Sequence, residues 1–140
     1  MKKLSAILAF GLLMTFGLAC SFSAGKTGVV AIESVTLAKD NGGKAGETVT
    51  AFTPSDKVQY FVVNLNEGKT GIRVKGVFTV VNADGVTDQK MAETEVVTAD
   101  DDQNKVNFHI SLPADFPSGE YKADFFLDNK LAKTLNYKVQ

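Results

Sequence analysis

The segment VNFHISL, residues 106–112, alternates apolar and polar side chains without a break. Successive side chains of a β-strand point to opposite faces, so this alternation predicts a strand with its apolar side chains, Leu112 included, on one buried face. A helix would spread the same apolar residues around its circumference. The segment therefore indicates β-structure that covers one side of a hydrophobic core.

The same period of two continues on both sides of this segment. A second alternating row at 121–127 is followed by Asp128-Asn129, a pair that tolerates positive φ and predicts a two-residue hairpin turn. Along the chain, the pattern predicts about seven strands spaced about 8–12 residues apart, which is typical of a β-sandwich or a small barrel. The expected strands cover residues 29–37, 57–65, 72–82, 90–98, 106–112, 121–127 and 131–139.

Local signals refine this prediction. Turns are expected at 40–46, which contains Asn41-Gly42, and at 82–85. Gly76 interrupts the inward row of the strand at 72–82 and indicates a close approach or a bulge. The strand at 90–98 carries several charges, which suits the edge of a sheet.

The N-terminus has the character of an export signal. Lys2 and Lys3 are followed by an uncharged apolar stretch, residues 4–18. This stretch is about 15 residues long, short of the roughly 20 that a membrane-spanning helix needs. We therefore predict that residues 1–19 form a cleaved signal peptide and that the protein is exported.

The run Phe-Gly-Leu-Ala-Cys at 16–20 resembles the lipobox of bacterial lipoproteins. The resemblance implies that the Cys20 thiol receives a diacylglyceryl group and that cleavage before Cys20 frees its amine for a further acyl chain. Ala19 fits the family pattern, whereas Gly17 and Leu18 depart from its commonest form. The next residue, Ser21, resembles the family's sorting signal for the outer membrane, facing the periplasm, if the cell has two membranes.

An ordinary secretory cut is the alternative, with Ser21 and Ser23 as the small residues at the cleavage site and Cys20 discarded. If Cys20 is retained and lipidated, residues 20–28 form a small, polar tether that reaches at most about 30 Å when extended. Two or more acyl chains hold a protein stably on a membrane. The domain would then lie close to the lipid surface.

The domain, roughly residues 29–140, resembles immunoglobulin-like and fibronectin-like β-sandwiches, and the residues that carry the resemblance lie mainly near the end of the chain. The run 117–123 looks like their tyrosine corner, in which Tyr121 bonds back to the upstream main chain. Ala123 holds the place of the second Cys of antibody domains, and Phe78 could fill the role of the third-strand Trp. The resemblance implies a single immunoglobulin-like antiparallel sandwich and no particular function.

Composition excludes several kinds of chemistry. The net charge is −1 with mixed signs, which argues against nucleic-acid binding. Cys20 is the only cysteine and His109 the only histidine, so neither a disulfide, a type-1 copper site nor a structural zinc site can be assembled. The two Gly-Lys-Thr runs, at 25–27 and 68–70, lack the earlier glycine of a P-loop. We expect no catalytic residues, no metal and no cofactor.

Carboxylates are the remaining candidates for chemistry. Residues 100–102 are three consecutive aspartates that could offer oxygens to calcium, but a solvated acidic loop is the better interpretation. Glu93 and Glu95 share one face of the charged strand and could in principle serve a hydrolase. A guard against edge-to-edge pairing explains them better.

The most distinctive surface feature is apolar. If the strands at 72–82, 121–127 and 131–139 share a sheet, Val77, Val81 and Phe126 point outward from it, and Tyr60 or Val62 does so on the other sheet. The leading hypothesis is therefore a non-enzymatic, lipid-anchored interaction or structural module of the cell envelope. It would be bound to the membrane through Cys20 and present a sheet face or an edge strand to an envelope protein. A carbohydrate-binding or cell-wall-binding sandwich is the alternative, and the oligomeric state is left open.

Overall fold

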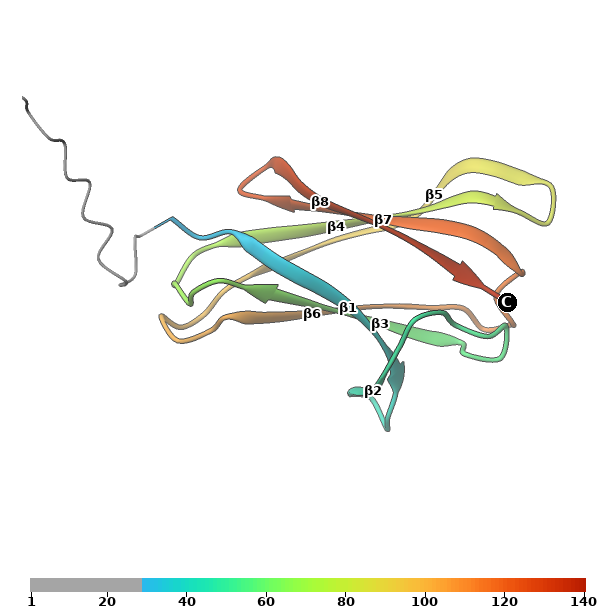
Figure 1. The fold of residues 1–140 in the computed structure, drawn as a ribbon, viewed down its shortest axis with the longest axis horizontal. Coiled ribbons are helices and arrows are strands. Elements are labelled where there is room, and N and C mark those ends of the chain that lie inside the picture. Colours follow the sequence, from blue (N-terminus) through green and yellow to red (C-terminus); the bar gives the residue numbers. More distant parts are fainter. Residues whose placement is uncertain (1–28) are drawn as a thin grey trace, which may run out of the picture.

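Two antiparallel four-stranded sheets pack face to face in the computed structural model, which describes residues 29–140 (Figure 1). The predicted signal peptide, Cys20 and the tether lie outside the described residues. The first sheet has the strand order β2-β1-β3-β6 and consists of β1 (Ile32–Asp40), β2 (Ala45–Val49), β3 (Val58–Leu65) and β6 (Lys105–Ser111). The second has the order β5-β4-β7-β8 and consists of β4 (Arg73–Ala83), β5 (Val86–Val97), β7 (Gly119–Leu127) and β8 (Lys130–Val139).

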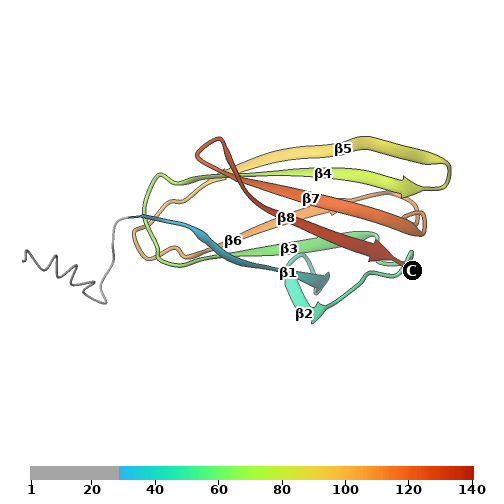
Figure 2. The same ribbon diagram turned by 45° about the horizontal axis from the view of Figure 1, so that its top comes forward.

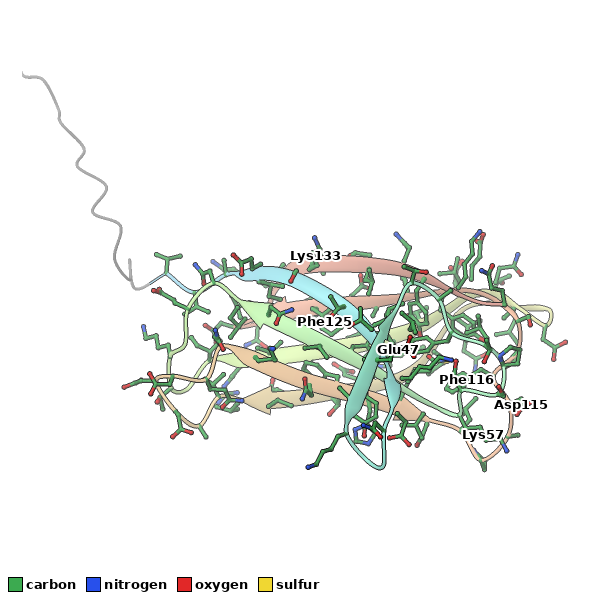
Figure 3. The ribbon with its side chains drawn as sticks, turned by 60° about the horizontal axis from the view of Figure 1, so that its bottom comes forward. Glu47, Lys57, Asp115, Phe116, Phe125 and Lys133 are labelled. Atoms are coloured by element: carbon green, nitrogen blue, oxygen red, sulfur yellow. The ribbon has the colours of Figure 1, made fainter. Side chains whose placement is uncertain are left out.

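The predicted all-β sandwich is confirmed, with one more strand than the seven expected. The additional strand is β2, which pairs with β1 at the edge of the first sheet. Its sequence, AGETV, has no alternation and contains a glycine, so nothing in its side chains marks it as a strand. The β1–β2 hairpin folds across the outer face of the first sheet, where Glu47 of β2 lies in front of the other strands (Figure 3).

The core is a cluster of aromatic rings between the sheets. Phe61 of β3 lies at its centre, with its ring centroid 4.8 Å from that of Phe78 on β4 and 5.2 Å from that of Tyr137 on β8. Phe125 of β7 meets Phe78 edge-on at 6.0 Å. Aromatic pairs in such tilted and edge-on arrangements add to the stabilisation that their buried area provides.

Gly76 lies in the inward row of β4, as predicted, and its lack of a side chain makes room for two rings. A Cβ atom placed there would lie 3.0 Å from Cζ of Phe78 and 3.3 Å from Cε1 of Phe125. Such contacts are tighter than ordinary van der Waals packing. The expected close approach is therefore confirmed, and no bulge is needed at this position.

The tyrosine corner is also confirmed. The hydroxyl of Tyr121 donates to the main-chain carbonyl of Pro117 across 2.5 Å, and its ring stacks on that of Tyr137. Ala123 pairs directly with Phe78 across β7 and β4, and both are fully buried. These are the relative places that the resemblance to immunoglobulin-like sandwiches implied for these residues.

Turn predictions hold where the signal is local. Asp128 and Asn129 have φ values of 47° and 70°, as a two-residue hairpin turn requires. The turn expected at 82–85 is shorter, because Ala83 still belongs to β4 and β5 already begins at Val86 instead of residue 90. The polar residues that follow Val86 concealed this start, since they show no alternation.

Leu112 corrects one detail of the predicted buried row. It was expected to point into the core together with Val106, Phe108 and Ile110, but 37% of its surface is exposed. β6 ends at Ser111, and the chain turns away at Pro113. Leu112 consequently lies at the rim of the sandwich.

Candidate interaction surface

The predicted apolar patch requires that the strands around 72–82, 121–127 and 131–139 share a sheet. They do, because β4, β7 and β8 all belong to the second sheet. Val77, Val81 and Phe126 are each half-buried. The register places Val77 and Phe126 on the outer face, and Val81, which has no partner on β7, lines a hollow with Glu120, Asn136 and Lys138. Phe126 pairs with Lys75 across the β4–β7 ladder, and Val81 lies six residues further along β4. At about 3.3 Å per residue, Val81 is roughly 20 Å from the level of Phe126. The three residues therefore do not form one compact group.

Charged side chains surround these apolar residues. Val77 pairs with Glu93 on one side and Asp124 on the other. The ammonium of Lys75 lies 4.8 Å above the ring centroid of Phe126 and 3.4 Å from a carboxylate oxygen of Glu93. Such cation–π and exposed ion-pair contacts contribute little stability each, but they give the face a mixed, hydrated character. An interaction role for Val77, Val81 and Phe126 stays a prediction.

Glu93 and Glu95, the pair considered for hydrolysis, are both engaged in ion pairs. Lys90 hydrogen-bonds Glu93 at 2.9 Å and, together with Lys75, holds the pKa of that carboxyl below its ordinary value. Glu95 lies 3.8 Å from Arg73. The lowered pKa of Glu93 favours its anionic form, whereas an acid catalyst needs a raised pKa.

The acidic loop and His109 hold no metal-ligand cluster. Asp101 accepts a hydrogen bond from the Thr70 amide at 3.0 Å, which ties the loop after β5 to the loop before β4. The ring of His109 lies beside that of Tyr60, 5.4 Å between centroids, on the outer face of the first sheet. Among residues 29–140, no group of three or more His, Cys, Asp or Glu side chains could hold a metal ion. The same part of the chain contains no helix with the length and apolar character needed to cross a membrane.

Tyr60 points outward, as expected, yet only 6% of its surface is exposed. Its neighbour across the ladder, Ala38 of β1, is equally covered. Both lie on the face that the β1–β2 hairpin crosses (Figure 3). The outer face of the first sheet therefore offers no aromatic surface at this position.

One apolar hollow of the sandwich was not predicted from the sequence. It runs between the two edge strands β5 and β6, and we call it the β5–β6 groove. Two cavities, of about 230 and 350 Å³, make up this groove and share Met91, Leu112 and Phe116. Its apolar lining consists mainly of Val86, Met91, Ile110, Leu112, Phe116 and Pro117.

An irregularity of β5 directs Met91 into this groove. Lys90 pairs with Thr79 and Ala92 with Phe78, so Met91 has no partner on β4. A residue inserted in this way leaves the regular alternation of the strand, and bulges commonly re-aim a side chain beside a functional site. Because a bulge leaves no mark in the hydrophobic pattern, the sequence could not reveal that Met91 and Leu112 meet.

The groove lies toward the end of the sandwich opposite to Val29. The described chain begins at Val29, beside the start of β1, whereas the groove extends to Asp84 in the β4–β5 turn (Figures 1 and 2). The long β5 edge and the β6 edge run between these two ends (Figure 2).

The comparison with solved structures defines the class of fold as an immunoglobulin-like β-sandwich. An immunoglobulin-like protein from Pseudomonas aeruginosa superposes with a TM-score of 0.50 at 17% sequence identity, covering 83% of this chain and 100% of that protein. The predicted immunoglobulin-like fold is thereby confirmed.

A second structural neighbour is a much longer protein. It is an alkylpurine DNA glycosylase from Pseudomonas fluorescens bound to DNA containing an abasic site analogue, with a TM-score of 0.50 and 8% identity. The match covers 79% of this chain and 30% of the glycosylase. No family model and no curated protein sequence matches the chain. At these identities the likeness extends to the fold alone.

Proposed function

We propose that this chain is a lipid-anchored interaction module of a bacterial cell envelope, without catalytic activity. The observation that carries the proposal is the apolar β5–β6 groove toward the end of the sandwich opposite to Val29. If Cys20 carries the lipid, the tether holds the Val29 end near the membrane and presents the groove toward the compartment beyond it. In a cell with two membranes, Ser21 favours the outer membrane and a groove that faces the periplasm.

The groove has the composition of a protein-binding surface. Hydrophobic and aromatic side chains with a few polar groups at the rim are typical of pockets that bind ligands or partner side chains. Leu112 and Val86 are each 37% exposed at its rim, which places apolar surface where a partner can reach it. The expected partner is another envelope protein.

Carbohydrate binding has less support. Sugar sites commonly stack their ligand on flat aromatic rings, and this chain has no tryptophan and three tyrosines. Tyr60, Tyr121 and Tyr137 are all buried. No observation on the described residues favours this alternative.

The anchor is tested on the full chain. We expect the wild type to fractionate with membranes and to carry the added mass of acyl chains, and Cys20→Ser to lose both properties. If wild type and Cys20→Ser both fractionate as soluble protein without added lipid mass, the anchoring part of the proposal is wrong.

The groove is tested by site-specific photo-crosslinking in the cell that produces the protein. A photoreactive residue at Leu112 should yield a discrete adduct with one envelope protein. The matched control places the same residue at Lys133, an exposed position on β8, which should yield none of this adduct (Figure 3). Equal yields at the two positions, or no adduct at Leu112, would refute a partner in the groove.

A further inference from the structure

The free edge of β6 is the most regular unpaired edge of the sandwich. Among the strands of residues 29–140, β6 is the last of its sheet and pairs only with β3, residue by residue and without a register shift. Its sequence, KVNFHIS, carries one formal charge, at Lys105, and no proline. Uncharged, unbulged edges are the ones that accept another strand.

The hydrogen bonds to β3 determine which main-chain groups of β6 are free. The Leu112 amide donates to Lys57 O at 3.0 Å, and the Leu65 amide donates to Asn104 O at 2.8 Å. In an antiparallel ladder, alternate residues turn both their N–H and C=O toward the same neighbour. The even-numbered residues of β6 therefore face β3, and Asn107, His109 and Ser111 turn their amides and carbonyls to the open side. The Lys105 carbonyl also points there, but it accepts from Gln103 Nε2 at 3.4 Å.

The other edges of the described domain are protected. β5 is interrupted at Met91 and carries charged side chains, Asp88, Lys90, Glu93 and Glu95 among them. β8 carries Lys130, Lys133 and Lys138 and shifts its register against β7, and its C-terminal end is occupied by Phe52, whose amide donates to Lys138 O. β2 has only five residues. Bulges, charges and short length are the usual protections against edge pairing.

The β5–β6 groove adjoins this free edge. A strand added to β6 would direct every second side chain toward the interior of the sandwich, as Phe108 and Ile110 are directed now. There the 230 Å³ cavity, lined by Met91, Ala92 and Phe116 among others, could accept a side chain of valine or leucine size. Main-chain pairing combined with pockets for alternate side chains is the mode of recognition called β-augmentation.

Charge further defines the segment that fits. Between Glu93 and Lys105 the chain carries five carboxylates, at positions 93, 95 and 100–102, and one cation, Lys105. The loop that contains residues 100–102 crosses from β5 to β6 at one end of the edge. A strand along β6 reaches this acidic loop, so a Lys or Arg at that end of the strand is favoured.

We propose that β6 accepts an extended segment of a partner protein as an additional strand. The segment has apolar side chains at alternate positions and a basic residue at the end near residues 100–102. This proposal deepens the proposed function and rests on it. A second copy of the chain fits less well, because the inward side chains of its own β6, Val106, Phe108 and Ile110, are already buried in its core.

The test uses the full chain in detergent and a synthetic peptide of alternating valine and threonine with lysine at both ends. We expect amide hydrogen exchange of Asn107, His109 and Ser111 to slow about tenfold when about nine tenths of the protein is occupied. The same peptide with glutamate in place of lysine should bind about fivefold more weakly. Slowing of other amides instead of these three would overturn the proposal.

Backbone methylation of the peptide provides a sharper control. Only one alternate set of peptide amides can face β6, since the N–H groups of an extended strand alternate between its two sides. N-methylation of one set, either the threonines or the valines, should therefore reduce binding by about tenfold or more. N-methylation of the other set should leave binding nearly unchanged. Equal binding of the two methylated peptides would contradict strand addition.

His109→Pro and His109→Ala form a matched pair in the protein. Proline removes the outward N–H without touching the ladder to β3, whereas alanine keeps it. Peptide binding should fall about tenfold or more in His109→Pro and stay near wild type in His109→Ala. If His109→Pro does not fold, the methylated peptides still decide.

The experiments distinguish failure of strand addition to β6 from failure of the proposed function. A specific photo-adduct at Leu112 with no slowing at Asn107, His109 and Ser111 would preserve the interaction module and refute strand addition. Protection of the same amides without peptide, together with a dimer in sedimentation, would assign the edge to a second copy and also refute the proposal.

Discussion

The hydroxyl of Tyr121 and the main-chain carbonyl of Pro117 are joined by a 2.5 Å hydrogen bond that closes the loop before β7 onto the strand. Burial raises the pKa of Tyr121, so the hydroxyl keeps its proton and remains a donor. Tyr121→Phe would keep the ring against Tyr137 and remove only this bond. We expect a loss of about 1 kcal/mol in the free energy of unfolding, measured by urea denaturation with an unchanged slope. A variant as stable as the wild type would show that the bond contributes nothing.

Gln59 is a second buried polar group, and it is only half satisfied. Its Oε1 accepts from the Tyr137 hydroxyl at 3.3 Å, while its Nε2 has no hydrogen-bond partner within the described domain. Tyr137→Phe would leave the whole amide unpaired and should destabilise the domain by about 1–3 kcal/mol. The double variant Gln59→Met with Tyr137→Phe removes both polar groups and should lose much less.

A double-mutant cycle in urea measures this coupling. The single variant Gln59→Met provides the control, because it leaves the Tyr137 hydroxyl, instead of the Gln59 amide, without its hydrogen-bond partner. Additive losses in the double variant would mean that the two side chains do not depend on each other.

Gly76 should resist even the smallest side chain. Gly76→Ala would place a Cβ 3.0 Å from the Phe78 ring, and we expect a loss of about 1–3 kcal/mol from overpacking. Phe78→Leu replaces the ring by a smaller side chain and should relieve the clash. The double variant should therefore lose less free energy of unfolding than the sum of the two single variants. Calorimetric or urea-based unfolding of the four proteins tests this, and strict additivity would contradict the proposed contact.

Glu93 should show a depressed pKa that depends first on Lys90 and then on Lys75. Because the folded pKa is lowered, the carboxylate favours folding above the unfolded pKa, about 4.3, and this contribution disappears as pH falls through the folded value. Lys90→Met should raise the pKa of Glu93 more than Lys75→Met does, as measured by NMR titration. High salt should reduce the difference, since the pair is exposed. The opposite order of the two variants would contradict the assignment.

Much of the local structure is determined by the sequence alone. The alternation in 106–112 and 121–127 was sufficient for an all-β domain, because side-chain direction along a strand follows from its period of two. The Asp128-Asn129 turn and the Tyr121 corner depend on groups a few residues apart, so a linear pattern contains them.

Which distant strands lie side by side was decided only by the tertiary structure. β2 carries no side-chain pattern and exists because the edge of β1 offers it main-chain partners. Val77, Val81 and Phe126 lie on two strands of one sheet, and the contact of Lys75 with the Phe126 ring joins β4 to β7, which are far apart in the chain. The β5–β6 groove arises where Met91 leaves the register and Leu112 leaves the core. A pattern along one strand records which way each side chain points, whereas an edge, a bulge or a groove depends on which other strand lies beside it.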